Sequence, residues 1–385
     1  MKKSLIALAV MAAAGAASAQ SSVTLFGIVD ATLQWGRGSI GDQFQLGNSG
    51  YNSSRLGFRG TEDLGGGMSA SFWLEAGVNN DNGSGAATNV NNNTSGGAAG
   101  CTVTGAAPAV PGAPVTCATT AGGTQGLTFN RRSTVSLAGN WGEVRLGRDY
   151  TPQFWNLTVF DPFGTNGVGT TQTLNGAAGV SGVTQVRASN SLGYFLPARL
   201  GGFYGQVQYY DGEQVTGPAT EDDGNGLALR VGFAQGPFNV ALALARTEYA
   251  AGDVRNVNLA GQWDFGMARV MGQIVRDNRE TAGGDLDGRG WLIGGLVPVG
   301  AGEIRLAYSR YLVEQVGANP RTQKLALGYV HNLSKRTAVY TTVAHLRNRN
   351  NGAAPGAAGG AALNGSTTGA NSNSTGVDLG IRHSF

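Results

Sequence analysis

The amino-acid sequence predicts an all-β protein, a sixteen-stranded antiparallel barrel that spans a membrane. Three observations support this fold class. Only 13% of the 385 residues are charged, whereas 64 are glycine. Apolar and polar residues alternate with period two over many segments, as they do in a strand with one apolar face. The connections between these segments are alternately tight turns and long polar loops, which is typical of outer-membrane barrels.

Composition and hydropathy exclude several other classes of protein. A helical membrane protein would be more apolar than the mean hydropathy of −0.11 indicates. A disordered chain would contain far fewer Leu, Val, Phe and Tyr residues, and an ordinary soluble enzyme would carry more Lys and Glu. Once Lys2 and Lys3 are set aside, basic and acidic residues nearly balance. The net charge therefore gives no indication that the protein binds nucleic acid.

The amino terminus has the three parts of a secretory signal peptide. Two lysines supply positive charge, residues 5–14 form a short apolar run, and Ala-Ser-Ala at residues 17–19 is a cleavage sequence. We therefore expect residues 1–19 to be removed and residues 20–385 to form a single barrel domain. The alternative is an uncleaved anchor, but the apolar run is shorter than a membrane-spanning helix requires.

Alternation is clearest at the carboxyl terminus, where Val377, Leu379 and Ile381 share one face and Asp378 and Arg382 share the other. A soluble β-sandwich also alternates, but these segments have the length of about nine to twelve residues that a tilted membrane strand needs. An even number of strands can close without leaving an unpaired edge in lipid. The predicted strands lie near residues 23–35, 54–62, 68–77, 128–138, 143–150, 187–196, 203–210, 226–234, 238–249, 254–265, 268–277, 289–298, 303–313, 322–331, 337–347 and 376–385.

The connections predict which rim faces which side of the membrane. Tight turns are expected near residues 63–67, 139–142, 197–202, 235–237, 265–266, 300–302 and 332–335. These would be the short periplasmic turns, and the long polar segments between them would be extracellular loops.

Three of the long loops have distinct compositions. Residues 78–127 and 348–375 are rich in Asn, Gly, Ala, Ser and Thr and cannot bury a core. Cys101 and Cys117 lie in the first of them, and a local disulfide is expected in an exported protein; a pair of free thiols is the alternative. Residues 151–186 contain several aromatic residues, so we expect this third loop to pack on the inner wall of the barrel.

No catalytic machinery is visible in the sequence. The chain has three histidines, at positions 331, 345 and 383, and none lies near a Ser or Asp in a pattern typical of a triad. The nucleophile elbow G-x-S-x-G, the zinc motif H-E-x-x-H and the Walker sequence are absent. An enzyme is therefore disfavoured.

The arginines are the informative charged residues. Leu56 and Phe58 take the outer face of their strand, so Arg55 and Arg59 must face inward. Alternation places five further arginines on inner faces, namely Arg145, Arg230, Arg269, Arg305 and Arg382. Arg131 and Arg132 are adjacent, so one of them is expected to face outward, near a rim or a subunit contact. Solvation in a wet lumen explains most of these positions, whereas a positive wall that sets ion preference is the functional interpretation.

Several stretches together resemble Gram-negative general porins of the β-proteobacterial type. Residues 23–27 (VTLFG) resemble the first strand of that family, and residues 54–67 (SRLGFRGTEDLGGG) its second strand and first turn. Residues 140–150 (NWGEVRLGRDY) resemble the approach to the constriction loop. The terminal Phe385 resembles the barrel-assembly signal of the family. The resemblance spans the chain after the signal peptide.

The resemblance implies a porin channel in the bacterial outer membrane. It implies passive diffusion of ions and small hydrophilic solutes without a cofactor, and a third loop, about 151–186, that folds into the lumen. By motif position Arg55, Arg131 and Arg187 match the family's arginine cluster on the wall. Asp161 lies where the acidic stretch of the loop would be.

The resemblance also implies partners and a charge balance. We expect a homotrimer, contact with outer-membrane lipid and lipopolysaccharide, and recognition by the barrel-assembly machinery. We also expect Arg59 and Arg132 at the constriction. Residues 151–186 contain one carboxylate, that of Asp161, so the arginines of the wall outnumber the acidic groups of the loop. A small imbalance of charge in a narrow pore is enough to predict a weak to moderate preference for anions.

Three alternatives remain at this point. A substrate-specific channel would need a line of aromatic residues, for which Phe154, Trp155, Phe160 and Phe163 are an indication. An adhesin-like surface barrel would need a narrow or blocked lumen, whereas sixteen strands predict an open one. An outer-membrane enzyme would need a catalytic constellation that the sequence does not contain.

Overall fold

In the computed structural model, the protein is a closed barrel whose wall has sixteen strands. The structure describes residues 22–86, 92, 126–171, 179–317, 319–350 and 361–385. The strands run around the barrel in chain order, and every neighbouring pair is antiparallel. They are β1 (Ser22–Arg37), β3 (Arg55–Gly65), β4 (Met68–Asn79), β6 (Arg132–Gly139), β7 (Gly142–Tyr150), β8 (Arg187–Phe195), β9 (Phe203–Tyr210), β10 (Gly226–Gln235), β11 (Phe238–Thr247), β12 (Val254–Asp264), β13 (Arg269–Arg279), β14 (Leu286–Val299), β15 (Gly302–Glu314), β16 (Arg321–Asn332), β17 (Thr337–Arg349) and β19 (Asn373–Ser384). The predicted fold class is confirmed.

Three short strands were not predicted. β2 (Gly41–Asn48) pairs with the second half of β1, and its first residues pair with β18 (Ser366–Thr367). β5 (Ser84–Gly85) pairs with the end of β4. The pairing of β2 with β18 joins loop segments that are far apart in sequence, whereas β2 and β5 also fold back on the strands that directly precede them.

The two faces of the wall have the polarity expected of a membrane barrel. On β1, Leu25 is 54% exposed and Val29 43% exposed, whereas Asp30, Thr32 and Gln34 on the opposite face are buried. Apolar side chains therefore cover the outside and polar side chains fill the inside. No helix among the described residues is long and apolar enough to cross a bilayer.

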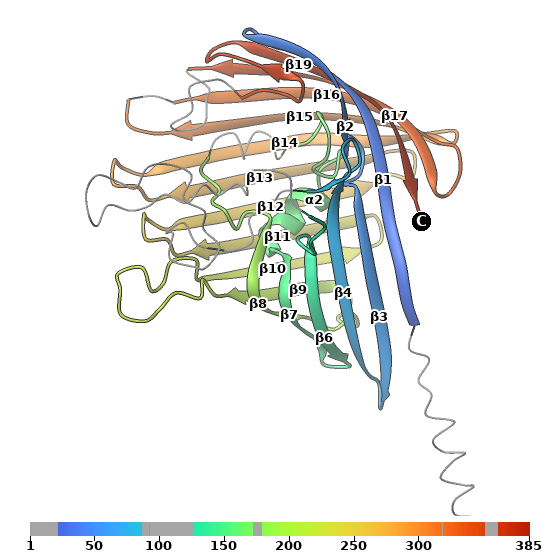
Figure 1. Cartoon of the computed structure of the whole chain (residues 1–385), viewed down its shortest axis with the longest axis vertical. Helices are drawn as coiled ribbons and strands as arrows, with labels where there is room; N and C mark the ends of the chain where they lie inside the picture. Colours follow the sequence, from blue (N-terminus) through green and yellow to red (C-terminus); the bar gives the residue numbers. More distant parts are fainter. Residues whose placement is uncertain (1–21, 87–91, 93–125, 172–178, 318, 351–360) are drawn as a thin grey trace, which may run out of the picture.

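The first and last strands close the barrel side by side (Figure 1). Their register pairs Ile28 with Ser384, and the backbone N–H of Phe385 donates to the carbonyl oxygen of Gly27 at 3.1 Å. A Cβ atom on Gly27 would lie 2.3 Å from Cζ of Phe385 and 2.8 Å from the carbonyl oxygen of Arg55. Glycine at this position therefore leaves room for the terminal aromatic ring beside the closing strands.

The third long loop enters the barrel, as predicted, and its helix α2 (Pro152–Val159) lies inside the wall (Figure 1). The side-chain amide of Asn156 donates to the carbonyl oxygen of Ala241 at 3.0 Å, and its oxygen accepts from Nε of Arg230. Nδ2 of Asn258 donates to the carbonyl oxygen of Gln153 at 3.1 Å. These bonds fix the helix to β10, β11 and β12.

The second half of the loop is fixed to the opposite part of the wall. The backbone N–H of Val168 donates to Oδ2 of Asp378 at 2.8 Å, and Nζ of Lys324 donates to the carbonyl oxygen of Thr170. Apolar side chains of the loop also pack on the inner wall, in a buried cluster that includes Phe163, Val168, Val180, Leu292, Ala307, Tyr311, Val313, Ala326, Ala344 and Leu346. The loop is therefore anchored to the wall at two places, at β10 to β12 through helix α2 and at β16 and β19 through residues 168–170.

Gly27→Ala should hinder closure of the barrel. The added methyl group collides with the backbone of Arg55 and the ring of Phe385, and overpacking of this kind costs about 1–3 kcal/mol. Urea unfolding in detergent and the heat-modifiable band on a gel measure the loss. Gly272→Ala is the control, because the nearest atom to its Cβ is 3.6 Å away. Equal stability of the two variants would contradict the expectation.

Asn156→Ala should loosen the docked helix α2. The change removes one hydrogen bond from a guanidinium group and one to a backbone carbonyl, which together stabilise the docked loop by about 2–4 kcal/mol. Single-channel recordings should show larger fluctuations of the open-state current. Asn278→Ala is the matched control, since Asn278 bonds to Asp287 of the neighbouring strand instead of the loop. Current noise that matches the control would contradict the assignment.

Candidate functional site

A cavity of about 580 Å³ lies between the inward loop and the wall. Four arginines line it: Arg55 at the start of β3, Arg131 just before β6, Arg187 at the start of β8 and Arg305 within β15. The remaining lining residues include Tyr51, Asn52, Ser53, Tyr150, Phe154, Trp155, Thr158, Asp161, Pro162, Phe163, Thr165, Asn166, Val186 and Leu296. Three of the arginines are those that the family resemblance placed on the wall.

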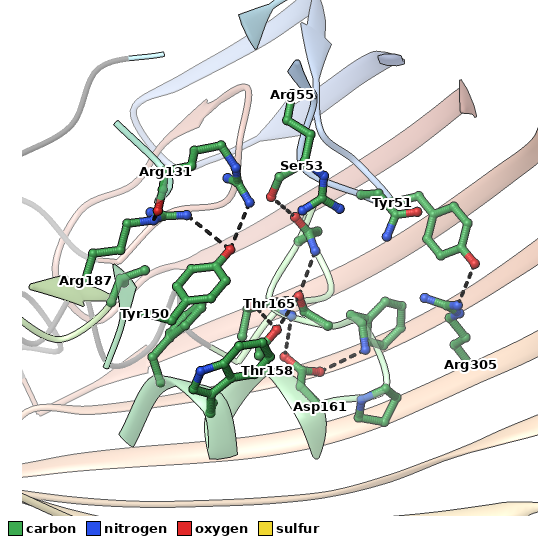
Figure 2. A pocket seen from close by; sticks show the side chains of 18 of the residues that line it. Tyr51, Ser53, Arg55, Arg131, Tyr150, Thr158, Asp161, Thr165, Arg187 and Arg305 are labelled. Atoms are coloured by element: carbon green, nitrogen blue, oxygen red, sulfur yellow. Dashed lines mark hydrogen bonds between the residues drawn. The ribbon is translucent and has the colours of Figure 1, made fainter. Parts of the chain in front are cut away.

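Two of the arginines are held together by a tyrosine. The hydroxyl of Tyr150 accepts from Nη2 of Arg131 at 2.8 Å and from Nη2 of Arg187 at 3.1 Å (Figure 2). Nε of Arg187 donates to the carbonyl oxygen of Arg131 at 2.9 Å, and its guanidinium lies 4.6 Å from the centre of the Tyr150 ring. The tyrosine therefore supports two like charges that would otherwise repel each other.

A buried glutamate offsets part of this charge. Oε1 of Glu75 accepts from Nε of Arg131 at 2.6 Å and lies 3.5 Å from Nη1 of Arg55. Oε2 accepts from the indole N–H of Trp73 at 3.1 Å.

Sequence analysis missed both Glu75 and Tyr150. Glu75 follows the inward alternation of β4, so its position could have been predicted, although its partners lie on other parts of the wall. Tyr150 could not have been predicted in this way, because strict alternation from Leu146 places it on the outer face. An irregularity in β7 between Gly147 and Asp149 turns it inward.

Asp161 lines the cavity, but its carboxylate is occupied by its own loop. Oδ1 accepts from the backbone N–H of Phe163 at 2.9 Å, and Oδ2 accepts from the N–H groups of Thr171 at 3.0 Å and Thr165 at 3.3 Å. The residue is 4% exposed. Burial raises the pKa of the Asp161 carboxyl, against the lowering effect of these hydrogen bonds. The structure brings it near the wall arginines, but its described hydrogen bonds shape the loop.

Arg59 and Arg132 lie outside the residues that line this cavity. The Arg59 guanidinium is 5.3 Å from the centre of the Phe26 ring and 5.2 Å from that of Trp73. Arg132 is 4.6 Å from the Trp73 ring. Trp73 and Glu75 share the inner face of β4, so these arginines form a separate group on the same wall, beside the cavity.

The expectation that Arg131 or Arg132 faces outward is wrong. Arg132 is paired with Glu75 in the register of β4 and β6, on the inner face. Arg131 precedes the first residue of β6 and lies in a bend, where strand alternation does not apply. Its side chain therefore turns back to Glu75 and Tyr150, and both arginines reach the interior.

The fourth lining arginine contacts a tyrosine from a different segment. Nη2 of Arg305 donates to the hydroxyl of Tyr51 at 3.0 Å (Figure 2). The same nitrogen lies 2.9 Å from Oε1 of Glu303. Tyr51 precedes β3, and its backbone N–H donates to Oδ2 of Asp30 at 2.8 Å. The segment before β3 is thereby folded into the lumen, where Tyr51 forms one side of the cavity.

Several predictions concern residues outside this site. Among the described residues, no three His, Cys, Asp or Glu side chains are grouped to hold a metal ion. Cys101 and Cys117 lie outside the described residues, as do residues 1–19, so the disulfide and the cleavage site stay predictions.

Comparison with known proteins places this arrangement in a family. The pattern of the Gram-negative porin family matches residues 5–351. Outer membrane porin protein 32 of Delftia acidovorans is 38% identical over 396 residues, with 100% of both chains covered. An outer membrane porin protein of Bordetella pertussis is 27% identical over 443 residues, also with 100% of both covered.

Solved structures agree with this placement. The structure of an anion-selective porin from Comamonas acidovorans has a TM-score of 0.75 and 33% identity, covering 95% of this chain and 100% of that one. OmpT of Vibrio cholerae in its trimer form has a TM-score of 0.62 at 14% identity, covering 95% and 99%, which shows the shared fold. The chain therefore belongs to the Gram-negative porin family and is an outer-membrane porin, a channel and not an enzyme.

Proposed function

We propose that this porin prefers anions and that its constriction between the arginine wall and the inward loop sets the preference. The observation that carries the proposal is the charge around one cavity. Four guanidinium groups line it, and the one lining carboxylate, that of Asp161, is bonded within its loop. The anion-selective porin of Comamonas acidovorans, with 33% identity to this chain, supports the same assignment.

Electrostatics in a narrow channel make this imbalance effective. A pore with a low-dielectric wall focuses the field of fixed charges, so a few unbalanced charges change the local ion concentration. Glu75 offsets one charge of the Arg55 and Arg131 pair. Glu303 offsets the charge of Arg305. The described hydrogen-bond partners of Arg187 are a tyrosine hydroxyl and a backbone carbonyl, and no carboxylate is among them. The site is therefore net positive.

The finer assembly of this porin is also a proposal. We infer a homotrimer, since closed symmetric assemblies are the default and the related OmpT structure is a trimer form. The exposed apolar face of β1, with Leu25, Val29, Leu33 and Trp35, is the candidate contact surface. Contact with lipopolysaccharide, recognition by the assembly machinery, a Cys101–Cys117 disulfide and removal of residues 1–19 belong to the same proposal.

Arg55→Ala should reduce the anion preference. The purified protein is reconstituted in a planar bilayer, and the reversal potential is recorded across a KCl gradient. The wild type should favour chloride. One unit charge contributes about 1 kcal/mol at about 4 Å in water-like surroundings, so its loss should lower the chloride-to-potassium permeability ratio by up to about fivefold.

The matched control for this variant is Arg289→Ala. Arg289 lies on β14 and faces outward, as Trp291 two residues further along the strand does. It is paired with Glu314 and does not line the cavity. Its removal should leave the reversal potential unchanged. A cation-selective wild type would overturn the proposed preference, and equal effects of the two variants would overturn the location of the site.

Asp161→Asn should change the permeability ratio by less than about twofold, much less than Arg55→Ala. The reason is that the carboxylate is buried in its loop, where the N–H groups that donate to it offset most of its field. The same KCl gradient measures the ratio. Asparagine offers one acceptor oxygen in place of two, so the variant should also show more open-state noise. If Asp161→Asn raised the chloride-to-potassium permeability ratio by as large a factor as Arg55→Ala lowers it, this description of Asp161 would be contradicted.

A further inference from the structure

We propose that the constriction cavity binds aromatic carboxylates, with the carboxylate on Arg131 and Arg187 and the ring against the indole of Trp155. The inference rests on the proposed anion preference and names the class of anion that the site holds longest. It follows from the composition of the two sides of the cavity and from the tyrosine that joins them.

One side of the cavity is apolar and aromatic. Phe154, Phe163 and Leu296 contribute to its lining from buried positions, and Phe154 and Phe163 are each 4% exposed. Trp155 is half-buried and also lines the cavity. Of the loop aromatics that suggested a binding site, Phe154, Phe160 and Phe163 therefore pack the loop. Trp155 is the one that retains an accessible ring.

Tyr150 brings the indole and the charged groups together. Its ring centre is 5.3 Å from that of Trp155, at 82°, and 4.8 Å from that of Phe154. The guanidinium of Arg187 lies 4.6 Å from the same tyrosine ring. The guanidinium and the indole therefore flank one side chain. A carboxylate attached directly to a six-membered ring combines, in one small ligand, a partner for each of these two groups.

The arginines have donors available for such a carboxylate. The described hydrogen bonds of Arg131 use Nε and Nη2, and those of Arg187 also use Nε and Nη2. Among the described residues, no hydrogen bond occupies Nη1 of either side chain, so each offers two N–H groups there. A planar carboxylate can accept from two such groups at once, and bonds of this kind are among the strong ones in proteins.

The shape of the site favours an aromatic anion over an aliphatic one of equal charge. Its volume of about 580 Å³ is in the range of small-molecule pockets. An arene gains an edge or stacking contact with an indole beyond simple burial of area, worth about 0.5–1.5 kcal/mol. A saturated ring of similar size would gain the burial but not this contact. The indole is therefore the group that should discriminate between them.

The test compares benzoate with cyclohexanecarboxylate, which has the same charge and a similar size. Each acid is added to the full-length porin in a planar bilayer in KCl, and the concentration that halves the single-channel chloride current is measured. Benzoate should block at a concentration about threefold to tenfold lower. Equal blocking concentrations would overturn the inference.

Variants locate the discrimination. Trp155→Leu keeps an apolar side chain but removes the arene, so benzoate and cyclohexanecarboxylate should then block at similar concentrations. Trp155→Phe keeps an arene and should retain the preference. Trp263→Leu is the matched control, because Trp263 is 45% exposed and lies on the outer face of β12, and it should behave as the wild type. A preference that survives in Trp155→Leu would overturn the role of the indole.

A second variant tests the charged side and stays informative if Trp155→Leu does not fold. Arg187→Gln should raise the blocking concentrations of both acids by similar factors and leave their ratio unchanged. A changed ratio would overturn the proposed division of roles. The reversal potential in KCl alone reports the proposed function separately. An anion-selective channel that does not distinguish the two acids overturns this inference and keeps the proposed function, whereas a cation-selective channel overturns both.

Discussion

The need to pair every backbone N–H and C=O group inside a membrane is the constraint on which the rest of this structure depends. The sheet meets it by closing on itself, with β1 joined to β3 on one side and β19 on the other. Closure exposes one face to lipid and encloses the other, so the polar face becomes the interior. The wall can therefore hold charged side chains at positions where a soluble sheet would bury an apolar core.

A polar interior also explains how the constriction is built. The inward loop combines an apolar cluster around Phe163 and Val168 with hydrogen bonds to wall side chains such as Arg230 and Asp378. The arginines of the cavity are positioned in the same way, by Tyr150 and Glu75. Charge, loop position and cavity shape thus depend on one continuous set of polar contacts. A change that leaves the charge unaltered, as in Asn156→Ala, is therefore expected to act on the same pore.

The alternation of apolar and polar residues predicted most strands of the wall. The side-chain contacts that it did not predict join residues on different strands. Alternation located the wall strands to within a few residues and placed Arg55 and Arg59 on the inner face. It could not show that Glu75 lies between Arg55 and Arg131, because these residues belong to three different parts of the wall. The expectation that Arg131 or Arg132 faces outward was wrong because Arg131 lies in a bend, where side chains do not alternate between the two faces.

The anchors of the inward loop have a consequence for the order of folding. Helix α2 is bonded to β10, β11 and β12, whereas Val168 is bonded to Asp378 of β19, the last strand in the chain. The loop cannot complete its set of contacts until that final strand is in place. The constriction is therefore incomplete in any state of the barrel in which β19 has not yet paired with its neighbours.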